Sequence, residues 1–147
     1  MIEAFDDGVP SKRILVADDD AVTLLLVATI LRHEGYDVDT SNGGKDAISK
    51  IELTPYDVVV LDLMMPEVSG LDVLRRLAVR DPQIKCVVIM SAASSFEVAG
   101  ATNPNVFAAL RKPFDNAALI TAVRGCIEAT CDPPAPPTQL KPVSKAA

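Results

Sequence analysis

The chain has 147 residues, a formal net charge of −6 and a hydrophobic content of 49%, which is enough for one domain with a real core. An acidic chain without a Lys/Arg cluster is not expected to bind nucleic acid. Its longest apolar run, residues 21–31, is shorter than the roughly 18 residues that span a bilayer, and its acidic N-terminus lacks the apolar segment of a secretory signal. We therefore expect a cytoplasmic protein without a membrane partner.

The three cysteines, Cys86, Cys126 and Cys131, are an odd number without the spacing of a disulfide framework. We expect them to be free thiols in a reducing cytosol. A metal or redox role is not expected, since His33 is the only histidine that could join them.

The first half of the chain alternates between strand and helix patterns. RILVA (13–17) has the length of a strand, residues 21–35 have the length of a helix, and YDVDTS (36–41) has the period of a half-exposed strand. A second helix is predicted over 44–53. Five residues share one face of the first helix: Val22, Leu25, Leu26, Thr29 and Ile30. Three residues of the second helix are expected to point inward: Ala47, Ile48 and Ile51.

The second half continues the alternation. Its predicted strands are the apolar runs 56–63, 84–90 and 105–112, of which the first two are continuous enough to be buried on both faces. Its predicted helices are a segment beginning at Gly70, a short one over 94–101, and one over 115–129 with Asp115 as the N-cap. Five strands alternating with five helices predict a parallel sheet with right-handed crossovers.

Polar residues stand where four of these strands end: Asp18-Asp19-Asp20, Asp62, Ser91 and Lys112. In open α/β sheets, ligands bind beyond the carboxyl ends of the strands, so these side chains should meet. Close carboxylates repel one another by roughly 4 kcal/mol at an effective dielectric of 20. Such a cluster favours Mg²⁺, and a carboxylate beside the ion can act as a nucleophile toward phosphorus. Ser91 and Lys112 are placed to bind phosphoryl oxygens.

The segments ILVADDD, VVVLDLMMPEVSGLDVL, VVIMSA and LRKPF, in this order, resemble the receiver domain of two-component response regulators. The resemblance covers residues 12–130 and implies a flavodoxin-like α/β fold with strand order 2-1-3-4-5. Residues 1–11 are then a short extension, and the Pro-rich residues 131–147 an extended or disordered tail.

The resemblance also implies roles for single residues. Asp62 would accept a phosphoryl group from a histidine kinase or a histidine phosphotransfer protein. Asp18, Asp19, Asp62 and the Met64 carbonyl would hold Mg²⁺ or Mn²⁺. Ser91 would be the switch hydroxyl, Lys112 would pair with the phosphoryl group, and the Lys112–Pro113 peptide would be cis. Such a protein catalyses its own phosphorylation and slow dephosphorylation and acts on no external substrate.

The chain departs from the family pattern at Ala109, where receivers usually carry Tyr or Phe. Phe107 lies two residues earlier, and Ala109 has no ring that could report phosphorylation. This departure leaves open a degenerate receiver that docks without being phosphorylated. A further alternative is a haloacid-dehalogenase-like phosphatase with Asp18 as nucleophile and Asp20 as acid/base, although Asp62 would then have no function. Asp20 also suits a simple helix N-cap.

The chain is expected to be a stand-alone regulator, because no DNA-binding or catalytic domain pattern follows residue 130. Its output would then pass to an unknown protein target through direct contact, from a monomer or a weak homodimer.

Overall fold

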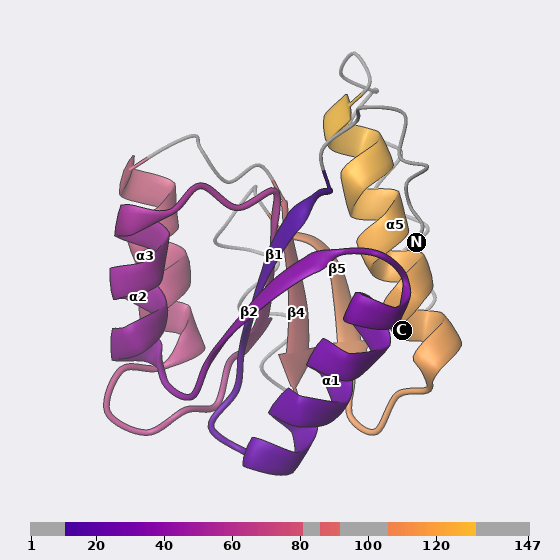
Figure 1. Ribbon diagram of the computed structural model, residues 1–147. Helices are drawn as coiled ribbons and strands as arrows, with labels where there is room; N and C mark the ends of the chain where they lie inside the picture. Colours follow the sequence, from indigo (N-terminus) through magenta and orange to yellow (C-terminus); the bar gives the residue numbers. More distant parts are fainter. Residues whose placement is uncertain (1–10, 81–85, 92–105, 132–147) are drawn as a thin grey trace.

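The computed structural model describes residues 11–80, 86–91 and 106–131. The strands are β1 (Arg13–Ala17), β2 (Asp37–Ser41), β3 (Val58–Asp62), β4 (Val87–Ser91) and β5 (Val106–Arg111). The helices are α1 (Ala21–His33), α2 (Gly44–Leu53), α3 (Gly70–Arg80) and α5 (Asn116–Cys131). Within the described residues, strands and helices alternate from β1 to β4, and β5 is the next described element after β4 (Figure 1). The helix predicted over 94–101 and both predicted tails lie largely outside the described residues.

All five strands pair in parallel, in the order β2-β1-β3-β4-β5. This confirms the flavodoxin-like arrangement that the resemblance to receiver domains implies. The order reverses at β1, so the carboxyl ends of β1 and β3 lie next to each other at the switch point, where open α/β sheets bind their ligands. In the described ranges, no helix is long and apolar enough to cross a membrane.

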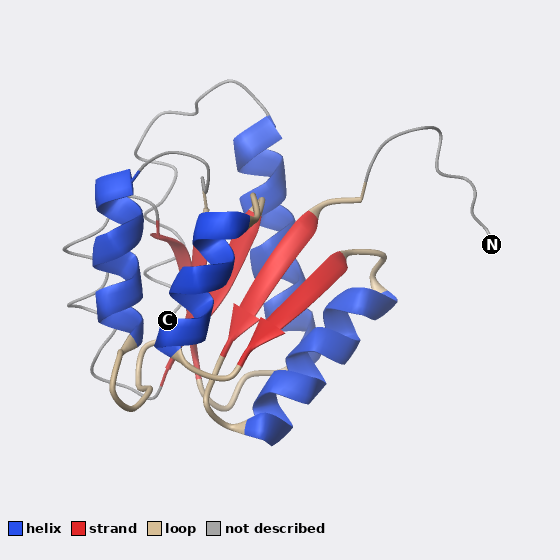
Figure 2. Cartoon of the chain, turned by 60° about the vertical axis from the view of Figure 1, so that its left-hand side comes forward, coloured by secondary structure: helices blue, strands red, loops and turns tan. Residues whose placement is uncertain are grey.

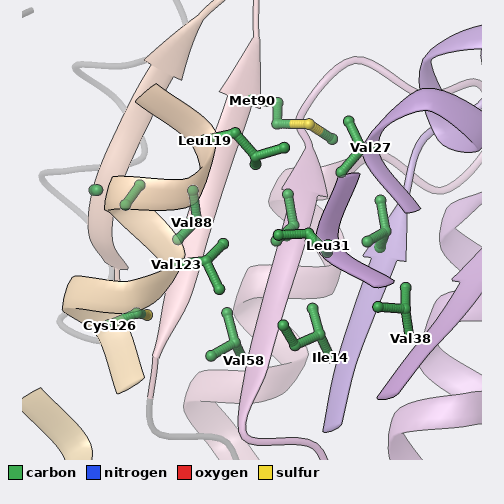
Figure 3. Close-up of a cluster of buried hydrophobic side chains, with 14 of the residues drawn as sticks. Ile14, Val27, Leu31, Val38, Val58, Val88, Met90, Leu119, Val123 and Cys126 are labelled. Carbon is green, nitrogen blue, oxygen red and sulfur yellow. The ribbon is translucent and has the colours of Figure 1, made fainter. Parts of the chain in front are cut away.

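Helices cover both faces of the sheet (Figure 2), which explains why every residue of β3 and β4 is buried. On one face, α1 and α5 pack against the sheet through a cluster that includes Leu31 and Val123 (Figure 3). On the other face, α2 and α3 supply Ala47 and Leu74 to a second cluster. The core is aliphatic, as the low aromatic content of 4% requires.

Most of the apolar face that spacing assigns to α1 does not pack on the sheet, although Ile30 of that face is packed against the core. Val22, Leu25 and Leu26 are 73%, 66% and 54% exposed, whereas Val27, Ala28 and Leu31 are buried. Apolar residues surround most of this helix, so its periodicity contains little information about orientation. For α2 the prediction is confirmed, because Ala47 is buried and Ile48 and Ile51 are packed against the core.

The expectation of free thiols is wrong for two of the three cysteines. Cys86, just before β4, and Cys126, in α5, form a disulfide with a Cα–Cα distance of 5.8 Å. The two residues are 40 positions apart in the sequence, and only the packing of α5 on the sheet brings them together. Sequence spacing contains no sign of such a contact.

Candidate functional site

Asp18 follows β1 and has no exposed surface. Its backbone N–H donates to the Ser41 carbonyl (3.1 Å), which continues the β1–β2 ladder by one residue. Its side chain accepts two hydrogen bonds, from the Asp20 N–H at Oδ1 (2.9 Å) and from the Lys112 ammonium at Oδ2 (2.9 Å). A fully buried carboxylate is therefore held in one orientation by the backbone on one side and by a cation on the other.

Asp62 is the last residue of β3 and is only 4% exposed. Its Oδ1 accepts the Met64 N–H (3.2 Å), and its Oδ2 lies 3.5 Å from the Lys112 ammonium. Burial, together with the negative charge of Asp18, raises the pKa of Asp62 to about 6, against the opposing effects of the Met64 N–H and Lys112. At neutral pH the carboxylate is still mainly ionised, as a nucleophile must be.

Lys112 comes directly after β5 and bridges the two buried carboxylates. Burial alone would lower its pKa, but the hydrogen bond and charge of Asp18, with the charge of Asp62, outweigh burial and raise the pKa. Its backbone N–H donates to the Ser91 carbonyl (2.9 Å), and its peptide bond to Pro113 is cis, as the resemblance implies. The ammonium is thus fixed between Asp18 and Asp62.

Ser91 ends β4, is fully buried and pairs in register with Arg111 of β5. Asp62 pairs with Met90, so the Ser91 backbone lies next to the position that follows Asp62. The structure therefore brings the ends of β1, β3, β4 and β5 together, with Asp18, Asp62, Ser91 and Lys112 at one edge of the sheet.

The three consecutive aspartates have different environments. Asp19 is exposed, and its carboxylate lies within 4.8 Å of those of Asp18 and Asp62. Asp20 is the N-cap of α1: its side chain accepts the Val22 N–H (3.2 Å) and the Thr23 hydroxyl (2.8 Å). These hydrogen bonds lower the pKa of Asp20.

The cap explains why three like charges can follow one another. Asp20 points to the helix, while Asp18 and Asp19 contribute to an acidic cluster with Asp62. Hard oxygen donors in a concave cluster with excess negative charge suit Mg²⁺ or Mn²⁺. Asp20 is already committed to backbone and hydroxyl donors, which argues against the phosphatase alternative, where it would act as acid/base.

A glycine that the sequence analysis used only as a helix start also shapes the site. A Cβ at Gly70 would lie 2.3 Å from the Asp62 carbonyl oxygen, and the Gly70 N–H donates to the Leu63 carbonyl (3.0 Å). The start of α3 thus touches the backbone of the candidate nucleophile, which no side chain would permit. The sequence signal for this contact is the presence of a glycine, Gly70, eight residues after Asp62.

Ala109 lies in the middle of β5, opposite Ile89, and packs against the cluster on the α2/α3 face. Phe107 packs on the α1/α5 face, where a Cβ on Gly125 would come within 3.1 Å of its ring. The pairing of β4 with β5 shifts register here, from Val87–Val106 to Val88–Ala108. Phe107 therefore lies on the opposite side of the sheet from Ala109 and does not replace the missing aromatic.

This arrangement of strand-end carboxylates and lysine is that of a receiver domain, and the chain belongs to the response regulator receiver family. The model of the response regulator receiver domain matches residues 14–124. Transcriptional regulatory protein TrcR of Mycobacterium tuberculosis is 33% identical over 121 residues, which cover 82% of this chain and 47% of TrcR. TcrX of the same organism, a probable transcriptional regulatory protein, is 40% identical over 98 residues, covering 65% of this chain and 41% of TcrX. The chain spans about half the length of the curated relatives it matches.

Solved receiver domains share the fold. One from Clostridium thermocellum is 28% identical, with a TM-score of 0.71 over 82% of this chain and 97% of that chain. The receiver domain of Francisella response regulator 1452 is 30% identical, with a TM-score of 0.70 over 82% and 99%.

Proposed function

We propose that this chain accepts a phosphoryl group on Asp62 and passes the signal on by contact with another protein. The observation that supports this most directly is the pair of buried carboxylates, Asp18 and Asp62, bridged by the Lys112 ammonium at 2.9 and 3.5 Å. A carboxylate and an ammonium held together at a sheet edge supply a nucleophile and a partner for phosphoryl oxygens.

Asp18, Asp19, Asp62 and the Met64 carbonyl would hold the Mg²⁺ or Mn²⁺ ion. Three carboxylates with ligand atoms within 4.8 Å of one another fit a hard divalent cation, since one ammonium does not neutralise them. When bound, the ion supplies charge stabilisation to the phosphoryl oxygens and offsets the repulsion among the carboxylates.

In the transfer step, a carboxylate oxygen of Asp62 attacks phosphorus in a phosphohistidine of the donor. The new O–P bond forms as the P–N bond breaks, and the imidazole nitrogen leaves with the bonding pair and takes up a proton. Lys112 loses part of its contact with Asp62 and pairs with the phosphoryl oxygens instead, while the Ser91 hydroxyl donates to a second oxygen. Water later attacks phosphorus of the acyl phosphate, the O–P bond to Asp62 breaks, and inorganic phosphate leaves, which restores the Asp62 carboxylate.

A protein donor fits the surface around this edge of the sheet. The exposed side chains of Val22, Leu25 and Leu26 lie on the first turns of α1, directly after the aspartates, and Met64, two residues after Asp62, is 62% exposed. Apolar side chains that flank a polar centre are typical of protein interfaces. The partner would be a histidine kinase or a histidine phosphotransfer protein.

The test is intact mass after incubation with acetyl phosphate and Mg²⁺. We expect one adduct of about 80 Da on the wild type and none on Asp62→Asn, since the nucleophile is removed. The matched control is Asp46→Asn, which changes an exposed carboxylate at the end of β2 and should leave the adduct unchanged. Asp19→Asn should weaken Mg²⁺ binding, so that formation of the adduct responds less to Mg²⁺, without removing the nucleophile.

No adduct from acetyl phosphate or from a phosphohistidine protein would contradict the proposal. The chain would then be a docking module on a receiver scaffold, the alternative that Ala109 leaves open. Turnover of a generic phosphomonoester by Asp62→Asn would instead support the phosphatase alternative.

A further inference from the structure

The Cys86–Cys126 pair lies away from the carboxylate cluster. Cys86 precedes the first residue of β4, whereas Ser91 is the last, so the pair and the cluster lie toward opposite ends of that strand. Both cysteines are buried in the cluster between the sheet and α5. Figure 3 shows Cys126 in this cluster. Neither has a role in the phosphoryl transfer described above.

Noncovalent contacts also hold α5 on the sheet beside the two sulfur atoms. On the same helix, Leu119, Ala122 and Val123 are buried against the sheet. One residue before Cys126, Gly125 allows α5 to approach the ring of Phe107 so closely that a Cβ would be 3.1 Å from it. We therefore expect the reduced chain to fold with the two thiols already adjacent.

The bond encloses a functional part of the chain. Its 40-residue loop contains β4, β5, and the site residues Ser91 and Lys112. A crosslink of this length restricts the unfolded chain and joins α5 to the strand that ends at Ser91. The covalent state of the pair is thus connected through β4 and β5 to the edge of the sheet where the carboxylates lie.

We propose that Cys86 and Cys126 are a reversible redox modification site: a buried dithiol that a low-molecular-weight disulfide oxidises to a crosslink between α5 and β4. One cysteine thiolate attacks the small disulfide and releases one thiol, leaving a mixed disulfide on the protein. The second cysteine attacks the protein sulfur of that mixed disulfide and releases the second thiol. Two protein thiols are oxidised and one small disulfide is reduced to two thiols, so the electrons balance.

Burial sets the rate of this exchange. Because both sulfurs are buried between α5 and the sheet, the oxidant reaches them only when this helix opens locally. Exchange should therefore be slow in the folded chain and faster in mild denaturant. This proposal does not depend on phosphorylation of Asp62.

The test uses the full chain, treated either with oxidised glutathione or with a thiol reductant, then unfolded and alkylated. After reduction we expect three alkylated cysteines. After oxidation Cys86 and Cys126 should resist alkylation, and the chain should be about 2 Da lighter before alkylation, not counting glutathione joined to Cys131. Returning the oxidised chain to reductant without denaturant should restore three alkylatable cysteines within hours. The oxidised chain should melt on the order of 10 °C higher, as expected for a loop of this length.

Cys131→Ser is the matched control and should keep the full redox response, whereas Cys126→Ala should form no crosslink between α5 and β4. Because this variant lacks the second thiol, Cys86 should either stay reduced or stop at the mixed disulfide with glutathione, which makes the chain heavier and not lighter. If Cys126→Ala does not fold, Cys86→Ala replaces it. Three alkylated cysteines after oxidation would overturn the proposal, as would a crosslink that requires Cys131. A crosslink that reductant opens only in the unfolded chain would also overturn it, because the bond would then be a permanent structural one.

Discussion

The ends of β2 and β3 lie at the same edge of the sheet, and both bury polar groups, but they differ in how the charges are balanced. At the end of β2, the buried Ser41 hydroxyl donates to Asp46 (2.7 Å), and Asp46 pairs with Lys50 at 3.2 Å. Lys50 also donates to the Thr40 carbonyl. One anion faces one cation, and each polar group has a partner within the chain.

At the end of β3, the described residues bring the carboxylates of Asp18, Asp19 and Asp62 together, and the Lys112 ammonium pairs with Asp18 and Asp62. The two strand ends therefore shift the pKa values of their carboxyl groups in opposite directions. The hydrogen bond from Ser41 lowers the pKa of Asp46, whereas burial raises that of Asp62 to about 6. The first end is a completed structural network, and the second holds excess negative charge that only a ligand can offset.

The largest difference between the two ends should appear when their lysines are removed. Lys112→Met leaves two buried carboxylates without their cation and should destabilise the chain by about 3 kcal/mol at pH 7. Lys50→Met removes a partner from a partly exposed carboxylate and should cost less than about 1 kcal/mol. Urea unfolding of both variants without divalent metal measures this difference. Equal losses would mean that the charge balance of the two ends is the same.

Removing a carboxylate should have opposite signs at the two ends. Asp62→Asn relieves the repulsion from Asp18 and should stabilise the metal-free chain by about 1–2 kcal/mol, while abolishing the stabilisation by millimolar Mg²⁺. Asp46→Asn weakens the contacts with Ser41 and Lys50 and should destabilise the chain slightly. Thermal unfolding with and without Mg²⁺ distinguishes these outcomes. A destabilised Asp62→Asn would contradict our account of the site.

The pH dependence follows from the raised pKa of Asp62. Native Asp62 titrates at about 6 and the unfolded residue near 3.8, so the native state binds this proton more tightly. Raising the pH through this window should therefore remove stability from the metal-free chain. Mg²⁺ should reverse the trend, because it binds the ionised form. Melting temperatures from pH 4.5 to 7 provide the measurement, and Asp62→Asn should lack this contribution.

The smallest expected effect concerns the loop that joins β3 to α3. Glu67 lines a cavity of about 510 Å³ together with residues of the α2 N-terminus, and its backbone has φ 66°, a region that favours glycine. Glu67→Gly should stabilise the chain by about 0.5–1 kcal/mol, net of the added freedom in the unfolded state. Glu67→Ala keeps the backbone cost and should have almost no effect. Chemical denaturation of both variants separates the backbone contribution from that of the carboxylate.

Much of the fold and the place of the site could be read from the sequence. Continuous apolar runs such as 56–63 indicated buried strands, and alternation with helices indicated a parallel sheet. Since the carboxyl ends of parallel strands share one edge, Asp18, Asp62, Ser91 and Lys112 were expected to meet there, and they do. The cis peptide at Pro113 followed from the family resemblance.

Other features depended on contacts between residues that are distant in the sequence. Which face of α1 is buried was decided by packing against α5 and the sheet, because a helix that is apolar on most sides does not determine its own orientation. The approach of Gly70 to Asp62 required the backbone path of the β3–α3 loop.

The order of the elements and the chemical groups at their ends follow from the amino-acid pattern alone, because both depend on local periodicity and on the rule that parallel strands end together. The electrostatic state of those groups and the pairing of Cys86 with Cys126 follow only from the packing of distant segments. The pKa of Asp62 depends on burial and on Asp18, 44 positions away in the chain, and the disulfide depends on α5 packing over β4. Burial and long-range distance are properties of the packed chain, and local sequence patterns do not encode them.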